Sequence, residues 1–96
     1  MLRIVVRPRA AADLEYIGAH SVAEWGEPRA KRYLEDLRQK IEFVAEFPGA
    51  GSPAVGLPAQ YRKVRSGAHR AIYRFTESEL IVVRVIHDRE DVPDEM

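Results

Sequence analysis

The hydrophobic repeat changes once along this chain, from a period of three to four residues to a period of two, and this change limits the possible folds. Before residue 47, apolar residues recur at spacings typical of one face of an amphipathic helix. After residue 60, apolar and polar residues alternate as they do along β-strands. Residues 48–58, between these parts, are rich in glycine, proline and alanine and have no period, so we expect a surface loop there.

Two helices are predicted before this loop. Pro8 suits the first turn of one helix, and Gly26 can end it. Pro28 can begin the second helix, which Pro48 ends because a residue before proline avoids the helical conformation. Only about three residues join them, so they should pack as an antiparallel hairpin. The predicted apolar stripes are Ala10, Leu14, Ile17, Ser21 and Trp25 in the first helix, and Ala30, Tyr33, Leu34, Leu37, Ile41, Val44 and Ala45 in the second.

The strands predicted outside the helices complete an α+β domain. One strand opens the chain, and three more follow the loop as an antiparallel meander with short turns. Their expected ranges are 2–6, 61–65, 70–75 and 80–86, with turns at 66–68 and 76–79. The order β-α-α-β-β-β predicts a helical hairpin packed on one face of a small, mainly antiparallel sheet. We expect residues 1–96 to form one domain, with an acidic tail from about residue 88.

Charge is divided into segments of opposite sign along the chain, although the net charge is zero. The window 47–76 holds five basic residues and no acid, and the first twelve residues hold three arginines and no acid. The segments 13–46 and 77–96 carry eight acids against five bases and seven acids against two bases. Because a focused positive potential attracts anionic or polyanion-handling partners, we expect the basic window to mark a binding surface.

Strand alternation assigns the basic side chains to faces of the sheet. In the predicted strand 70–75 it places Arg70, Ile72 and Arg74 on one face, and Ala71, Tyr73 and Phe75 on the other. In the last strand it groups Leu80, Val82, Arg84 and Ile86 on one face, and Ile81, Val83, Val85 and His87 on the other. We expect the sheet face opposite the helices to be lined or rimmed by Arg62, Arg65, Arg74 and Arg84. Their guanidinium groups could bind phosphate or carboxylate, or each could be a solvated charge on a packed stem.

Two of the three histidines are candidates for acid–base chemistry, because imidazole titrates near neutrality. His69 and His87, beside Arg74 and Arg84, could supply the base, the acid and the cations that RNA cleavage requires. The alternative is that both histidines are hydrogen-bonding residues at strand ends, and His20 should be solvated on the first helix. The chain has no cysteine, no His-x-x-x-His helix pair and no phosphate-binding loop, so we expect no metal and no cofactor.

Aromatic residues on the predicted hairpin suggest a second binding surface. Tyr16, Trp25 and Tyr33, with Leu37, could line a groove for an amphipathic segment of another chain. The alternative for each of these residues is ordinary packing in the core.

Several fragments of the sequence resemble the RelE/ParE superfamily of bacterial toxins from type II toxin–antitoxin systems. Together they cover nearly the whole chain in the family's order and spacing. They are Pro8-x-Ala10-x-x-Asp13-Leu14-x-x-Ile17, Trp25-Gly26, Ala30-x-x-Tyr33-x-x-x-Leu37-x-x-x-Ile41, Phe47-Pro48-x-x-Gly51, Tyr61-Arg62, Ser66-Gly67-x-His69, Ile72-Tyr73-Arg74 and Ile81-x-Val83-Arg84-Val85-Ile86-His87-x-Arg89-x-Asp91. The Trp-Gly pair and the Ser-Gly-x-His fragment resemble the ParE branch.

Resemblance to the ParE branch implies a plasmid-stabilising toxin that traps DNA gyrase on cleaved DNA, is not a catalyst, and is neutralised by a cognate ParD-like antitoxin. The RelE branch instead implies a ribosome-dependent mRNA endoribonuclease. That branch usually has a tyrosine or another catalytic side chain just after the last strand. Here acids and no aromatic residue follow His87, and acids would repel RNA. The isoelectric point near 6.8 is also low for a ribosome-binding nuclease. Both departures favour the ParE branch. His87 and Arg84 fit the RelE pattern, so the ribonuclease remains the alternative.

The resemblance and the charge pattern together assign residues to the two partners. We expect the target to be contacted by Arg62, Arg65, Arg74, Arg84 and Arg89, and the antitoxin by Tyr16, Trp25, Tyr33 and Leu37. No sequence-specific DNA binding is expected from this chain alone. No stretch approaches the about 18 apolar residues of a membrane span, and arginines interrupt the N-terminus where a signal peptide would be apolar. We therefore expect a cytoplasmic protein.

Overall fold

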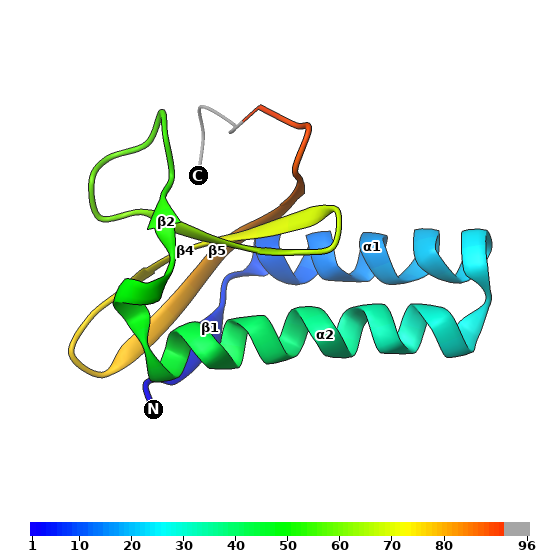
Figure 1. Ribbon diagram of the computed structural model, residues 1–96, viewed down its shortest axis with the longest axis horizontal. Helices are drawn as coiled ribbons and strands as arrows, with labels where there is room; N and C mark the ends of the chain where they lie inside the picture. The colour runs from blue at the N-terminus through cyan, green and yellow to red at the C-terminus, as the bar shows by residue number, and fades with distance from the viewer. Residues whose placement is uncertain (92–96) are drawn as a thin grey trace.

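The computed structural model describes residues 1–91, which form two helices on one face of a five-stranded sheet (Figure 1). The elements are β1 (Arg3–Val6), α1 (Pro8–Trp25), α2 (Glu27–Glu46), the 3₁₀ turn η1 (Pro48–Ala50), β2 (Ser52–Pro53), β3 (Arg62–Ser66), β4 (His69–Phe75) and β5 (Glu79–His87). The predicted α+β class and the helical hairpin on a mainly antiparallel sheet are confirmed. Neither helix in this part of the chain is long and apolar enough to cross a membrane.

Strand β2 lies inside the segment that was expected to be only a loop. It pairs with β3 at one edge of the sheet, with Ser52 opposite Lys63 and Pro53 opposite Arg62. Two residues are too few to show alternation, and proline is tolerated in an edge strand because its missing N–H is not needed there. The sequence pattern therefore could not reveal this strand.

The helical hairpin depends on one residue between its helices. Gly26 separates α1 from α2 and has a φ of 84°, a left-handed conformation that glycine adopts at little cost. The two helices run side by side in opposite directions (Figure 1). Because α2 faces the sheet, its buried positions recur at helical spacing: Ala30, Leu37, Ile41, Val44 and Ala45.

The sheet has the order β1-β5-β4-β3-β2, so the first and last strands are neighbours. Strands β1 and β5 are parallel, and the other pairs are antiparallel. A parallel pair requires a long connection, and the hairpin supplies part of it while covering one face of the sheet. Because α1 directly follows β1, and β1 pairs with β5, the start of α1 lies beside β5.

Tyr73 lies in the centre of the core between the helices and the sheet and is fully buried. Its hydroxyl donates to the Pro48 carbonyl (2.8 Å) and accepts from the Gly51 backbone N–H (3.1 Å). Burial raises the pKa of Tyr73. A Cβ atom at residue 51 would overlap the Tyr73 hydroxyl, which explains the glycine in the Pro48-x-x-Gly51 fragment.

The sheet face opposite the helices carries a second, smaller core, so it is less open than the sequence suggested. Its buried residues are Ala54, Ile72, Ile81, Val83 and Ile86, with Val5, Leu57 and Tyr61 packed against them. Residues 54–61 of the loop after β2 supply part of this cover. The basic side chains of this face are therefore confined to its rim.

A β-bulge in β5 changes the faces that simple alternation predicted. Tyr73 pairs with Val82 and Ile72 with Arg84, which leaves Val83 as an extra residue. After this point the phase is reversed, so Val85 packs on the helix side with Val82, and Ile86 packs on the opposite side with Ile81. The predicted grouping of Arg84 and Ile86 with Leu80 and Val82 is wrong for this reason.

Candidate functional site

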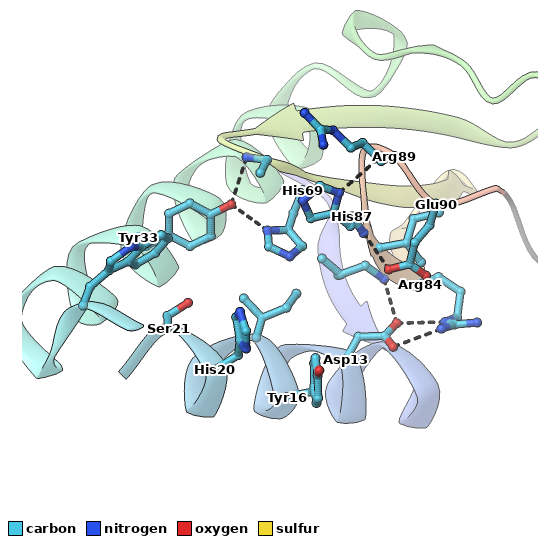
Figure 2. A pocket seen from close by; sticks show the side chains of 15 residues that line it. Asp13, Tyr16, His20, Ser21, Tyr33, His69, Arg84, His87, Arg89 and Glu90 are labelled. Atoms are coloured by element: carbon cyan, nitrogen blue, oxygen red, sulfur yellow. Dashed lines mark hydrogen bonds and ion pairs between the residues drawn. The ribbon is translucent and has the colours of Figure 1, made fainter. Parts of the chain in front are cut away.

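A cleft of about 670 Å³ lies between α1 and the ends of β4 and β5 (Figure 2). We call it the α1–β5 cleft. Its lining residues are Asp13, Tyr16, Ile17, His20, Ser21 and Trp25 from α1, Tyr33 from α2, and Ala68, His69, Arg84, Val85, Ile86, His87, Arg89 and Glu90 from the β-strand side. The aromatic residues and the histidines, which the sequence analysis placed on two separate surfaces, therefore share one cavity.

Asp13 and Arg84 form an ion pair at one end of the cleft, as Figure 2 shows. Arg84 Nε and Nη2 donate to the two oxygens of Asp13 at 2.8 and 3.1 Å. The backbone N–H of Val85 also donates to Asp13, at 2.9 Å. Only 13% of the Arg84 side chain and 18% of the Asp13 side chain are exposed. The hydrogen bond with Asp13 raises the pKa of Arg84, so this arginine stays charged and fixed in place.

Asp13 also explains how α1 is attached to the sheet. Strand β1 pairs with β5 only as far as Val82, which leaves the next N–H groups of β5 without a strand partner. The carboxylate on the second turn of α1 accepts one of them and pairs with the neighbouring guanidinium. Asp13 was not among the predicted site residues, although its place in the Pro8-x-Ala10-x-x-Asp13 fragment was an available signal.

Tyr33 connects α2 to the turn between β3 and β4. Its hydroxyl lies 2.6 Å from His69 Nδ1 and accepts from the Ala68 backbone N–H at 3.0 Å. When the Tyr33 hydroxyl donates to Nδ1, His69 is in the tautomer that carries its proton on Nε2. Gly67 has a φ of 58°, and a Cβ atom there would lie 2.6 Å from the Tyr33 ring. The Ser-Gly-x-His fragment is thus the sequence that lets this tyrosine approach the turn.

His69 and His87 are paired residues of β4 and β5, and their rings meet edge to face with centroids 5.4 Å apart. Burial, and then the nearby His87, lower the pKa of His69. His87 Nδ1 accepts from the Arg89 backbone N–H at 3.1 Å. Both rings therefore make hydrogen bonds at strand ends, as the alternative interpretation of the histidines predicted.

The residues proposed for RNA cleavage are only partly brought together. His69, Arg84 and His87 line the cleft, but Arg74 lines a different cavity. Arg84 is paired with Asp13, so its charge is already neutralised. Within residues 1–91, no group of three or more histidine, cysteine, aspartate or glutamate side chains is placed to hold a metal ion.

The candidate antitoxin contacts divide into surface and core residues. Tyr16 is 71% exposed and Trp25 is 41% exposed, while Tyr33 is half-buried beside them. The Arg29 guanidinium lies 4.7 Å from the Trp25 ring centroid and keeps that indole in place on the hairpin. Leu37 is fully buried between the helices and the sheet, so its side chain offers no surface to a partner. The prediction that Leu37 lines a docking groove is therefore wrong. Leu37 recurs at helical spacing because that face of α2 packs in the core.

The candidate target contacts are also dispersed. Arg62 donates to the Gly51 carbonyl at 2.6 Å, and Arg65 pairs with Asp88 at 2.8 Å. Arg84 pairs in register with Ile72 of the face opposite the helices, but its guanidinium is bound to Asp13 of α1 and only 13% of its side chain is exposed, so little of it is available to a partner. Arg89 is exposed at the rim of the cleft (Figure 2). Arg74 lies near Arg7 and Arg9, which the sequence analysis did not include among the contacts.

Comparisons with known proteins agree with this geometry. A family model described as ParE toxin of type II toxin-antitoxin system, parDE, matches residues 4–92. The chain is 40% identical over 79 residues to Toxin ParE1 of Caulobacter vibrioides, which covers 82% of this chain and 81% of that protein.

Two solved structures share the fold. The chromosomal ParDE system of P. aeruginosa aligns with a TM-score of 0.76 and 20% identity, over 91% of this chain and 96% of that one. The RelBE2 toxin–antitoxin complex of Mycobacterium tuberculosis aligns with a TM-score of 0.60 and 19% identity, over 90% of each chain.

Proposed function

Because the chain belongs to the ParE toxin family of type II toxin–antitoxin systems, we propose that it inhibits DNA gyrase by trapping the enzyme on cleaved DNA. A cognate antitoxin would neutralise it, and both would act in the cytoplasm. The structural observation that best supports a binding role is the state of the α1–β5 cleft. Its principal polar groups are already bonded to one another, while two aromatic side chains are exposed beside them.

This arrangement favours binding over proton transfer. A general base or acid must reach a substrate with a free atom, and catalytic cations must be available to a phosphate. Here Asp13 neutralises Arg84, and Arg74 lines a different cavity, so neither cation is available to a phosphate beside the histidines. The exposed aromatic rings can instead bury a large apolar area against a partner.

The antitoxin would dock at the α1–β5 cleft, with Tyr16 and Trp25 as the main contacts and Tyr33 at its wall. Aromatic side chains at an interface commonly contribute most of the binding energy, because each buries a large surface with few rotatable bonds. The gyrase complex would be contacted by basic residues at the sheet rim. Arg89 and Arg65 are the most exposed of the arginines proposed earlier. Arg62 and Arg84 would act indirectly, by holding the loop and α1 in place.

The decisive experiment mixes the purified protein with gyrase, ATP and supercoiled plasmid, then denatures and digests the protein. We expect linear DNA, released by this digestion from the trapped covalent complexes, to accumulate with toxin concentration. Addition of the antitoxin encoded next to the toxin should abolish this product. A toxin that leaves supercoiling and DNA integrity unchanged would contradict the proposal.

The same protein should be tested on ribosomes with a defined message, since His69, Arg84 and His87 share the cleft. We expect the message to remain intact. Cleavage in the decoding site with normal gyrase activity would establish the ribonuclease alternative. Loss of that cleavage in His87→Ala, with retention in His20→Ala, would then place the chemistry at the strand ends.

A further inference from the structure

Three arginines converge on a cavity of about 310 Å³ that lies apart from the α1–β5 cleft. Arg7 and Arg9 come from the junction of β1 and α1, and Arg74 comes from the end of β4. Tyr61 and Val83 complete the cavity with Pro8. We call this the arginine cavity. None of its lining residues lines the cleft, so the two sites are separate surfaces of the molecule.

The positive charge of the arginine cavity is not neutralised by any acidic side chain in the part of the chain that the structure describes. No carboxylate of residues 1–91 forms an ion pair with Arg7, Arg9 or Arg74, whereas Arg3, Arg38, Arg65 and Arg84 each have an acidic partner. The first turn of α1 also holds no acid. Three cations without local counter-charges produce a focused positive potential, to which the positive end of the α1 dipole adds.

The chemistry of this cavity matches a phosphodiester. A guanidinium can present two parallel N–H groups to the oxygens of one phosphate. Arg7 and Arg9 are exposed and Arg74 is half-buried, so their charged ends are accessible to a polyanion. Tyr61 is half-buried at the wall and offers an aromatic surface to a sugar or base next to the phosphate.

We propose that the arginine cavity binds a phosphodiester of the DNA backbone, without reading its sequence. This proposal rests on the proposed function, because the DNA would be the segment that gyrase holds while the toxin is bound. Contacts to phosphate position a protein on DNA but do not discriminate bases. The toxin would thus contact both gyrase and DNA in the trapped complex. Its contact with DNA would slow the release of the cleaved strands.

The first test measures binding of the isolated toxin to a fluorescent DNA duplex by anisotropy at several salt concentrations. We expect Arg9→Gln/Arg74→Gln to weaken binding at least about tenfold and to lower the slope of log K against log salt by about 2. The control, Lys31→Gln/Arg32→Gln, removes the same charge from exposed positions of α2 and should change neither quantity appreciably. Equal weakening by both variants would show a general charge effect and overturn the proposal.

The second test separates this proposal from the proposed function by using gyrase. Arg74 was predicted from the sequence to contact the target, and that contact is now assigned to the DNA of the target complex. We therefore expect Arg9→Gln/Arg74→Gln to bind gyrase without DNA as the wild type does, but to yield fewer cleaved complexes. If the variant traps gyrase normally and binds DNA normally, the site is wrong and the toxin function stands. If the wild type fails to trap gyrase but binds DNA through these arginines, the proposed function is wrong and the site stands. If the variant loses affinity for gyrase alone, the cavity binds an acidic protein surface instead.

Discussion

The α1–β5 cleft and the arginine cavity both contain arginine from the central strands, yet the two arginines have different environments. In the cleft, Arg84 is almost covered and donates two hydrogen bonds to Asp13. In the arginine cavity, Arg74 has no acidic partner among residues 1–91 and remains half-exposed. One guanidinium is therefore part of the fold, and the other is available to a ligand.

This difference shows why a cluster of basic residues in the sequence does not by itself define a binding surface. An arginine that is neutralised inside the protein contributes little to the external potential, and loss of its partner is costly because it leaves a buried charge uncompensated. An arginine without a partner instead adds to the positive potential at the protein surface and speeds the association of anionic partners.

The largest expected effect is on stability. Asp13→Ala should lower the free energy of unfolding by about 3 kcal/mol, because it leaves a mostly buried guanidinium and the Val85 N–H without their acceptor. Arg74→Ala should change it by less than about 0.5 kcal/mol, since that side chain has no acidic partner among residues 1–91. Urea denaturation of both variants measures the difference. Equal losses would show that the two regions are not distinct.

A smaller effect is expected on antitoxin affinity. Tyr16→Ser removes the most exposed aromatic side chain of the cleft and should weaken antitoxin binding about tenfold or more, without lowering the melting temperature. Phe43→Ser is a matched control, because Phe43 is 49% exposed on α2 and does not line the cleft. Calorimetric titration measures both. Equal weakening by the control, or none by Tyr16→Ser, would contradict docking at the cleft.

The smallest effect concerns pH and involves only the cleft. Burial and His87 lower the pKa of His69 below 6.5, although Glu90 and Asp88 oppose this shift and His20 adds to it. The unfolded chain therefore takes up a proton at this residue before the folded chain does, as the pH falls. The free energy of unfolding should decrease below about pH 6.5 and level off below the folded pKa.

This pH dependence can be assigned with a pair of variants. His69→Gln should flatten the decrease in urea-denaturation measurements between about pH 5 and 8, and His20→Gln on the exposed side of α1 should reduce it less. An unchanged slope in His69→Gln would place the titration elsewhere. The lining of the arginine cavity contains no histidine and no carboxylate, so Arg74→Gln should keep the wild-type slope.

Much of the fold followed from local patterns. The two helices, the three strands of the meander and the faces of β4 were predicted because burial against a single layer imposes a period of 3.6 or 2 on the residues that touch it. Leu37 shows the limit of this reasoning. Its spacing identified an apolar side chain of α2 but could not distinguish a core residue from one in a docking groove.

The candidate sites were predicted less completely than the elements that carry them. The sequence identified Tyr16, Trp25, Tyr33 and the two strand-end histidines as notable, but it assigned them to separate surfaces. The structure places them in one cleft because β5 crosses beside α1 and because the bulge at Val83 shifts the phase of its last residues. A single extra residue in a strand leaves no mark on the hydrophobic pattern when valine and isoleucine occupy both faces.

The amino-acid sequence by itself determined the family, the order of elements and the segregation of charge, because each depends on residues that are near one another in the chain. Only the tertiary structure decided which charges are neutralised and which are free. Asp13 and Arg84 are 71 positions apart, and the arginine cavity combines residues 7 and 9 with residues 61 and 74. Strand register and helix packing bring such residues together, so the distinction between a structural arginine and a binding arginine arises only when the chain has folded.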